Sequence, residues 1–214
     1  MKLTLYYAPI TCSLVVLISL NESGAEFEVK RVNLRKIEQR SPEFLRINPK
    51  HKVPVLLIDG KPLTENVAMA LWMTRAFPKA GILPADSDTE VKAISLMAWC
   101  ASGIHPHLTR INSPAKFCDT PGSEESIKRL AAKELDHVFG IVNDVLAGRE
   151  YFFDKWCAAD SHFFWTWRRA IQLGLDFPKY RNCAAHYERM QQRPAVKKAL
   201  DIEKQVQAEF AKAA

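Results

Sequence analysis

The sequence predicts an α/β N-terminal domain with the element order βαβαββα, followed by an all-α, helical C-terminal domain. Strand-like segments and tight-turn signals occur before residue 78, and beyond residue 88 the chain has helical runs with no convincing strand. The stretch 78–88 contains two prolines, a glycine and several small polar residues, a composition typical of a linker. We therefore expect domains at residues 1–78 and 89–214, joined by a linker at 79–88.

The first predicted unit is βαβ. Residues 2–7 and 27–33 have the composition of strands, and the apolar segment Leu14–Leu20 between them is predicted to be a helix. Asn21–Gly24 follows this segment and contains residues that end helices. The two strands are therefore expected to be joined by a helical crossover.

A second helix and a hairpin are predicted next. Ser41 is a helix-capping residue and Pro42 stands at the first helical position, where proline is favoured. Residues 54–58 and 61–63 are predicted strands, and Asp59-Gly60 between them is a pair that hairpin turns prefer.

The remaining predicted elements are helices. Apolar residues at helical spacing predict the last element of the N-terminal domain over residues 65–77. Ser87-Asp88-Thr89-Glu90 is a capping-box sequence, and Pro178 and Pro194 each stand where a helix would begin. The helices of the C-terminal domain are expected at residues 89–117, 125–147, 158–174, 178–192 and 195–212.

Composition limits the class of protein. The chain has 214 residues, of which 48% are hydrophobic and 25% charged, as in globular proteins that bury a sizeable core. The N-terminal apolar run is too short for a signal peptide and no later stretch approaches a membrane span, so we expect a cytoplasmic protein without membrane contact. The net charge of +6 is scattered along the chain, which favours an anionic small ligand over nucleic acid.

The cysteines indicate reduced thiols. They lie at positions 12, 100, 118, 157 and 183, with neither a C-x-x-C pair nor the Cys/His spacing of a metal site, so we expect no bound metal. Cys12 has the most informative position, because Tyr7–Leu14 ends a strand and opens a helix. With Thr11 as the N-cap, Cys12 would fall in the first helical turn, where free N–H groups and the helix dipole favour a thiolate. On the residues alone, a small buried apolar role for Cys12 is the favoured interpretation, and the family context below is what favours the functional one.

Several motifs in the right order resemble the cytosolic glutathione transferases. They are the strand order, the Pro9-x-x-Cys12-Ser13 helix start, residues 48–56 (NPKHKVPVL) and residues 63–68 (LTENVA). The resemblance is closest to the bacterial, cysteine-bearing beta-like branch and extends over the whole chain. It implies a thioredoxin-like N-terminal domain, an all-helical C-terminal domain, a homodimer and a role in detoxification.

The resemblance also implies that glutathione is the co-substrate. The Val53-Pro54 peptide is then expected to be cis, and the backbone N–H and C=O of Val53 would pair with the cysteinyl amide of glutathione. Asn66 and the start of its helix would meet the γ-glutamyl carboxylate, and Glu65 would meet the α-amino group. Without the resemblance, Pro54 is compatible with an ordinary strand start and Glu65 with a favourable charge in a first helical turn.

Further contacts are implied on both sides of the linker. Lys36 and Lys52 would meet the glycyl carboxylate, and His51, where the family often has glycine, would reach the same group or close the loop. Ser102 and His105 share one helix face, and His105 matches a histidine that lies near the thiol in beta-like relatives. Each of these residues is also compatible with a structural or solvated role.

The sequence departs from the family pattern at two places. The acidic residue and the lysine that flank the histidine in relatives are replaced by Gly103 and Pro106, which leaves the contribution of that helix open. Cys157 stands where the family has the serine or threonine of a buried N-cap box, whereas Asp160 keeps the other half of that box. The second departure concerns stability.

Three functions are compatible with these residues. The first is attack of the glutathione thiolate on small hydrophobic electrophiles, with Cys12, Ser13 and His105 as catalytic residues. The second is glutathione-dependent disulfide reduction through a mixed disulfide on Cys12, and the third is ligand binding with little activity. If the helix start activates Cys12, its pKa is below the ordinary thiol value and it is the first cysteine to be alkylated. A second-substrate pocket would be built from residues such as Phe117, Phe163, Trp165 and Trp167.

Overall fold

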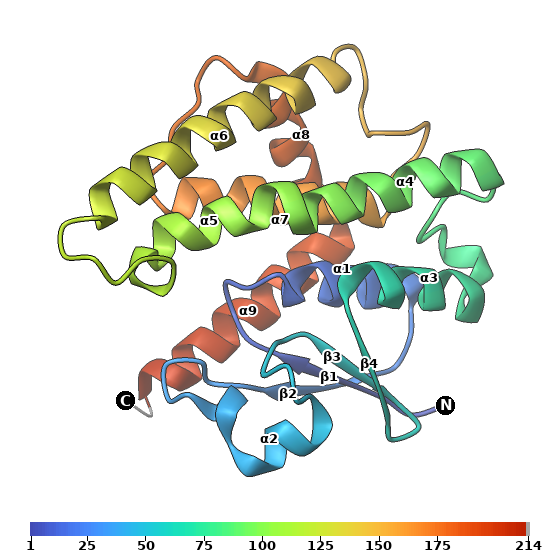
Figure 1. Cartoon of the computed structure of the whole chain (residues 1–214). Coiled ribbons are helices and arrows are strands. Elements are labelled where there is room, and N and C mark those ends of the chain that lie inside the picture. Colours follow the sequence, from blue (N-terminus) through green and yellow to red (C-terminus); the bar gives the residue numbers. More distant parts are fainter. Residues whose placement is uncertain (213–214) are drawn as a thin grey trace. The chain divides into compact units, whose positions relative to one another are not determined.

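The computed structural model describes residues 1–212 and divides the chain into two compact units (Figure 1). The first unit comprises residues 1–85 together with the C-terminal segment from Gln192 onward, and the second comprises residues 86–191. Within the described residues, every helix is too short or too polar to span a membrane.

The first unit is built on a four-stranded mixed sheet with the strand order β2-β1-β3-β4. β1 (Leu3–Tyr7) pairs in parallel with β2 (Glu28–Arg31) and antiparallel with β3 (Val55–Ile58). β3 in turn pairs antiparallel with β4 (Lys61–Thr64) at the edge of the sheet. Pro62 is tolerated in β4 because this strand has a partner on one side only.

Helices cover both faces of this sheet. α1 (Ser13–Ser23) and α3 (Asn66–Ala76) lie on one face and α2 (Pro42–Ile47) lies on the other (Figure 1). On the α2 side, Phe44 packs with Val32 and Val55 in a small buried cluster. The predicted order βαβαββα is therefore confirmed; short 3-10 turns at Glu38–Arg40 and Pro78–Ala80 complete the unit.

Local signals account for α2 and for the hairpin. Ser41 Oγ accepts a hydrogen bond from Phe44 N at 3.2 Å and Pro42 opens the helix, as the sequence predicts. Asp59 and Gly60 have φ angles of 48° and 83°, and a two-residue type I′ turn requires positive values at both positions.

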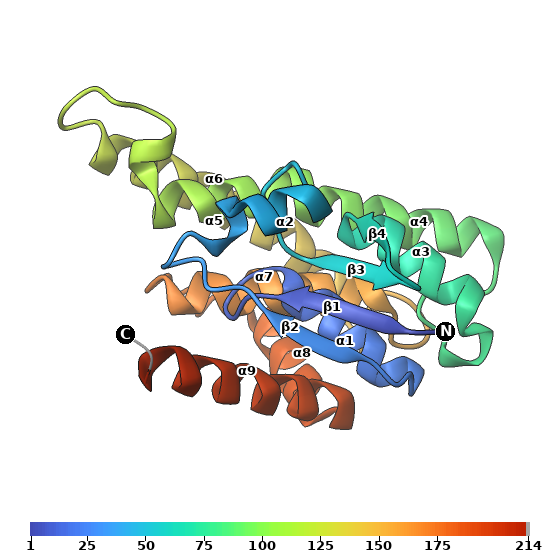
Figure 2. The same cartoon turned by 90° about the horizontal axis from the view of Figure 1, so that it is seen from below.

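The C-terminal helix α9 (Pro194–Lys212) packs against α1 (Figure 2). Both helices belong to the first unit. The sequence assigns this helix to the helical domain; the structure differs because its apolar side is buried on the first unit. Glu203 lies on that side and is itself buried, and its Oε2 accepts hydrogen bonds from the Tyr7 hydroxyl and from Ile10 N, each at 2.8 Å. The apolar residues that α9 buries are Ala195, Val196, Ala199 and Val206.

The second unit is helical throughout its regular structure within residues 86–191. A π-helical turn at Cys100–Ile104 interrupts the predicted helix 89–117, because Pro106 has no N–H to donate to the carbonyl four residues before it. The helical segments are α4 (Ser87–Trp99), the π-helical turn, α5 (His105–Asn112), a 3-10 turn (Pro114–Lys116), α6 (Glu124–Val145), α7 (Ala158–Gln172) and α8 (Arg181–Gln192).

Two helix starts differ from those predicted. The N-cap of α4 is Asp86 rather than Ser87, and the carboxylate of Asp86 accepts hydrogen bonds from the backbone N–H groups of Asp88 and Thr89. Pro178 lies before α8 instead of opening it, whereas Pro194 does open α9.

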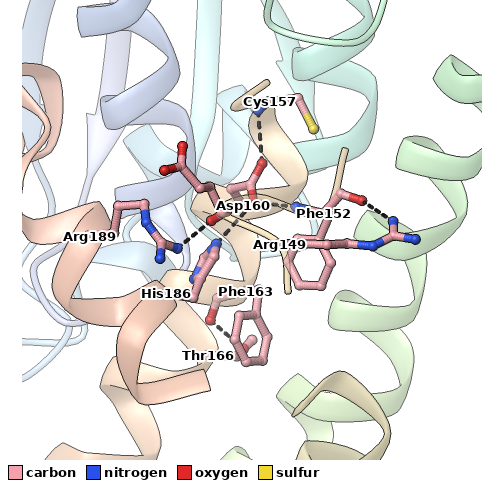
Figure 3. A network of polar contacts seen from close by, with 9 residues as sticks. Arg149, Phe152, Cys157, Asp160, Phe163, Thr166, His186 and Arg189 are labelled. Carbon is pink, nitrogen blue, oxygen red and sulfur yellow. Dashed lines mark hydrogen bonds and ion pairs between the residues drawn. The ribbon is translucent and has the colours of Figure 1, made fainter. Parts of the chain in front are cut away.

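A buried polar network holds the start of α7 (Figure 3). Asp160 Oδ2 accepts a hydrogen bond from Cys157 N at 2.9 Å, and Asp160 Oδ1 accepts one from Phe152 N at 3.1 Å and lies 3.0 Å from His186 Nε2. Asp160 therefore supplies the half of the N-cap box that the sequence predicts. Burial, followed by the Asp160 carboxylate, raises the pKa of the Cys157 thiol, so this cysteine is an inert structural group.

Candidate functional site

The loop between β1 and α1 places a thiol at the start of a helix. α1 begins at Ser13, and its N-cap is Cys12 rather than the predicted Thr11. The Thr11 hydroxyl lies 2.8 Å from both the Ala8 carbonyl oxygen and Ser13 Oγ, and its oxygen accepts a hydrogen bond from Ser13 N at 3.2 Å. Thr11 therefore orders the loop, and the buried Ser13 hydroxyl is directed at Thr11.

Three segments that are distant in sequence meet at Cys12. Cys12 Sγ donates toward the Val53 carbonyl oxygen at 3.8 Å, and Asn66 Nδ2 donates to the Cys12 carbonyl oxygen at 3.2 Å. The Val53–Pro54 peptide is cis, as expected. The helix start, the residue pair before β3 and the first residue of α3 are thus joined by hydrogen bonds at Cys12.

The ionisation of Cys12 is the reverse of the expectation. Burial raises the pKa of the Cys12 thiol to about 12, and the Glu65 carboxylate acts in the same direction. A backbone hydrogen bond, the Asn66 side chain and the Lys52 ammonium act to lower that pKa and do not compensate. The prediction of a pKa below the ordinary thiol value is therefore wrong, because desolvation outweighs the favourable position at the helix start.

Glu65 and Asn66 form the start of α3. Glu65 is the N-cap and has a φ angle of 73°, a left-handed conformation that residues other than glycine rarely adopt. Such strain concentrates at functional sites. The exposed carboxylate of Glu65 already has a partner, since Lys50 Nζ lies 2.5 Å from Glu65 Oε1 and 2.8 Å from Thr64 Oγ1.

The segment before β3 is held by Asn48. Asn48 Nδ2 donates to the Lys52 carbonyl oxygen at 2.7 Å, and Asn48 Oδ1 accepts a hydrogen bond from Lys50 N at 3.2 Å. His51 has a φ angle of 47°, which explains why glycine suits this position. The Lys52 side chain is exposed beside this turn.

The other predicted residues lie farther along the chain. Lys36 is exposed on the segment after β2, where its backbone N donates to Asn33 Oδ1 at 3.2 Å. Ser102 and His105 belong to the second unit and are described there by themselves. The Ser102 hydroxyl donates to the Ala98 carbonyl oxygen at 2.9 Å, and the His105 ring packs edge-on against Trp165 with 4.6 Å between the ring centroids.

Comparison with known proteins decides the family. Residues 1–72 match the family model described as glutathione S-transferase, N-terminal domain. The chain is 32% identical to glutathione S-transferase GstA of Escherichia coli O157:H7 over 203 residues. This matched region covers 93% of this chain and 98% of that protein. The chain belongs to the glutathione S-transferase family.

Solved structures of glutathione transferases share the fold over nearly the whole chain. A glutathione transferase homologue from Sulfitobacter, with bound glutathione, has a TM-score of 0.87 and 27% identity over 94% of this chain and 97% of that one. A bacterial beta-class glutathione S-transferase of Sphingomonas chungbukensis has a TM-score of 0.81 and 30% identity over 94% and 98% of the two chains. The prediction of a thioredoxin-like domain followed by a helical domain is confirmed.

Within this family, Gly103 has a structural explanation. A Cβ at this position would stand 2.6 Å from both Cδ1 and Nε1 of the Trp99 indole, closer than side-chain carbons approach one another in proteins. The indole therefore packs directly over the glycine, and an acidic side chain at residue 103 would have to displace it.

The aromatic residues expected around a second substrate divide into two groups. Phe163, Trp165 and Trp167 are buried in the core of the second unit and are unavailable to a ligand there. Phe117 is 45% exposed, and the Arg110 guanidinium lies 5.2 Å from its ring centroid. Both residues line an open cavity of about 360 Å³ beside α6, together with His107, Cys118, Ile127, Leu130, Ala131 and Glu134.

Metal and disulfide chemistry find no support in the described residues. Residues 1–212 contain no cluster of three or more His, Cys, Asp or Glu side chains that could hold a metal ion. All five cysteines in that part of the chain are free thiols.

Sequence reasoning missed Lys50 and Glu203. Lys50 lies two residues from the predicted Lys52, and only the folded chain brings its ammonium to Glu65. Glu203 did carry a signal, because a carboxylate placed between Ala199 and Val206 on an apolar helix side must find hydrogen-bond donors.

Proposed function

We propose that this family member catalyses attack of the glutathione thiolate on small hydrophobic electrophiles. The observation that carries the proposal is the Cys12 thiol at the start of α1, with its Sγ 3.8 Å from the Val53 carbonyl oxygen, where burial raises the pKa of the thiol. A thiol with a pKa of about 12 is a hydrogen-bond donor at neutral pH, and a thiolate is the species it would stabilise. The attacking sulfur therefore comes from glutathione, and no metal or redox cofactor is required.

Glutathione would lie along the first unit with its sulfur at the N-terminus of α1. Its cysteinyl amide would pair with the backbone of Val53, its γ-glutamyl carboxylate would meet Asn66 and the start of α3, and its α-amino group would meet Glu65. The glycyl carboxylate would be bound by the side chains of Lys36, His51 and Lys52.

The helix start lowers the pKa of the bound thiol by favouring its anion. One pKa unit corresponds to about 1.4 kcal/mol, and a helix N-terminus with one charge-assisted hydrogen bond supplies roughly that amount. Cys12 would donate this hydrogen bond. Ser13, Ser102 and His105 are the further candidates for catalytic or binding contacts, as the family resemblance implies.

The alternative in which Cys12 forms a mixed disulfide is less favoured. Thiol–disulfide exchange requires a thiolate as the attacking group. Burial opposes that ionisation at Cys12. A binding protein with little activity is the third candidate, which the replacement of the family's acidic residue and lysine by Gly103 and Pro106 supports.

We also propose a cytoplasmic homodimer that acts in detoxification. Five free cysteines and a reduced thiol as co-substrate suit a reducing compartment. The family resemblance supports a two-fold dimer. Sedimentation at micromolar concentration is expected to give twice the 24.3 kDa chain mass, and a monomer would contradict this assembly.

Two substrates separate the three functions. The purified chain is expected to conjugate glutathione to a chloronitrobenzene at a rate well above the uncatalysed reaction, and to reduce hydroxyethyl disulfide slowly. The reverse order of rates would favour the reductase. Calorimetric binding of glutathione with neither activity would identify a binding protein.

A further inference from the structure

We infer that Lys50 is a built-in competitor of the ligand's α-ammonium for the Glu65 carboxylate, and that this competition lowers the affinity for glutathione. The inference rests on the proposed function, in which Glu65 meets the α-amino group of the γ-glutamyl residue. It adds a residue that sets affinity and that the family resemblance did not assign.

The geometry places a primary ammonium where the ligand's ammonium is expected. Lys50 Nζ lies 2.5 Å from Glu65 Oε1 and 2.8 Å from Thr64 Oγ1, so one cation is held by a carboxylate and a hydroxyl. The α-ammonium of glutathione has the same charge and the same three N–H donors as a lysine ammonium. Two ammonium groups beside one carboxylate repel each other, so each weakens the hold of Glu65 on the other and Lys50 competes with the ligand.

The backbone on both sides of the pair is fixed. Lys50 N donates to Asn48 Oδ1 at 3.2 Å, and His51 N donates to the Asn48 carbonyl oxygen at 3.0 Å. On the other side, Glu65 is held at the N-cap of α3, where its carbonyl accepts a hydrogen bond from Met69 N at 3.0 Å. The displacement therefore needs only a rotation of the Lys50 side chain into solvent.

Both side chains of the pair are exposed. Lys50 is therefore easily displaced, and its effect on the affinity for glutathione is small. The Lys50 and Glu65 side chains are 52% and 69% exposed, and exposed ion pairs contribute little because water screens them. Removing the competitor should therefore tighten glutathione binding about two- to fivefold, the equivalent of about 0.4 to 1 kcal/mol. The effect should shrink as the ionic strength rises.

Exchange of one ammonium for another leaves the charge near the thiol unchanged. The Glu65 carboxylate is close enough to Cys12 to raise the pKa of its thiol. Lys50 neutralises that carboxylate before the ligand arrives, and the α-ammonium would do so afterwards. A ligand without an α-amino group would leave Lys50 in place.

Calorimetric titration with glutathione at low ionic strength tests this inference. Lys50→Met removes the charge and keeps the length of the side chain, and Lys61→Met removes one charge from an exposed position on β4 as a matched control. We expect Lys50→Met to bind glutathione two- to fivefold more tightly than the wild type, and Lys61→Met to bind it unchanged. Equal or weaker binding by Lys50→Met would overturn the inference.

Two further titrations keep this result separate from the proposed function. Glu65→Gln should weaken glutathione binding, and in that background Lys50→Met should have no effect; a gain that persisted there would contradict the competition. The glutathione analogue with a glutaryl group, which lacks the α-amino group, should bind wild type and Lys50→Met alike. If Glu65→Gln left glutathione binding unchanged, the proposed contact of Glu65 would itself fail.

Discussion

Cys12 stands at a position that favours ionisation, in surroundings that oppose it. A helix N-terminus stabilises a negative charge by about 0.3 to 2 kcal/mol. The rise of the Cys12 pKa from 9.0 to about 12 corresponds to roughly 4 kcal/mol in the opposite sense, and burial is its largest cause. Desolvation therefore determines the protonation state of this thiol, which is consistent with the hydrogen-bond donor role that we propose for Cys12.

This balance predicts the order in which the cysteines react with a small alkylating agent. At pH 8 a thiol with a pKa of about 12 has a thiolate fraction of about 10⁻⁴. Cys118 is partly exposed, and hydrogen bonds from Ser123 and Thr120 lower the pKa of its thiol. We expect Cys118 to be labelled first and Cys12 much later, the reverse of the order that the helix start alone predicts. Mass mapping of a time course in which Cys12 is alkylated first would contradict this account.

His162 makes stability depend on pH. Burial lowers the pKa of His162 to about 3, and the neighbouring His105 acts in the same direction. The unfolded chain binds this proton near pH 6.5 and the folded chain does not, so stability present above pH 6.5 is lost as the pH falls toward 3. The free energy of unfolding should decrease by up to about 1.4 kcal/mol per pH unit from this group.

A non-titrating side chain of similar size should remove that dependence. Urea unfolding of His162→Leu between pH 7.5 and 5 is expected to show a smaller loss of stability than the wild type. His137→Leu, which replaces an exposed histidine on α6, is the matched control and should keep the wild-type slope. Equal slopes for His162→Leu and the wild type would refute the assignment.

Among the elements, α9 joins the chain's end to the loop that carries Cys12. The carboxylate of Glu203 accepts hydrogen bonds from the Tyr7 hydroxyl and from Ile10 N. Ile10 has a φ angle of 70°, so its backbone is held in a conformation that needs support from its surroundings. Glu203 supplies that support from a helix almost two hundred residues later in the chain.

Loss of the Glu203 carboxylate should lower the free energy of unfolding. In Glu203→Leu the buried Tyr7 hydroxyl and the partly buried Ile10 N–H each lose a hydrogen bond to a carboxylate, and loss of such a bond costs about 1 to 3 kcal/mol. The control is Glu209→Gln on the same helix, because Glu209 pairs with Arg31 at an exposed position where an ion pair is worth at most about 1 kcal/mol. Denaturant unfolding is the measurement; a Glu203→Leu protein as stable as Glu209→Gln would show that α9 does not hold the loop.

For the whole molecule, the sequence predicts what depends on neighbours in the chain. Ser41-Pro42, Asp59-Gly60 and the alternation of strand and helix segments are local signals, and the element order they predict is confirmed. The placement of α9 depends on a distant contact, and the structure groups this helix with the first unit rather than with the helical domain to which the sequence assigns it. The direction of the Cys12 pKa was missed for a similar reason, because desolvation by the folded surroundings is its largest cause and the local sequence does not show it.

The candidate site was predictable only as a set of residues. The order of the motifs predicts that Cys12, Val53 and Asn66 lie at one site, and the structure confirms that they are neighbours. The Lys50–Glu65 pair could not be predicted, since two surface charges fifteen residues apart carry no pattern. Contacts of this kind are set by the fold and not by neighbours in the chain.

In the mechanism that we propose, the attacking sulfur belongs to glutathione and Cys12 acts as a hydrogen-bond donor. Conjugation to a chloronitrobenzene by the wild type, Cys12→Ser and Cys12→Ala tests it most directly. Serine keeps a donor at this position and alanine removes it, and one lost hydrogen bond to a charged group costs about 1.5 to 3 kcal/mol. We expect Cys12→Ser to retain kcat/KM within a few-fold and Cys12→Ala to lose roughly ten- to a hundredfold. Abolition of conjugation in both variants would mean that the Cys12 sulfur itself carries the reaction.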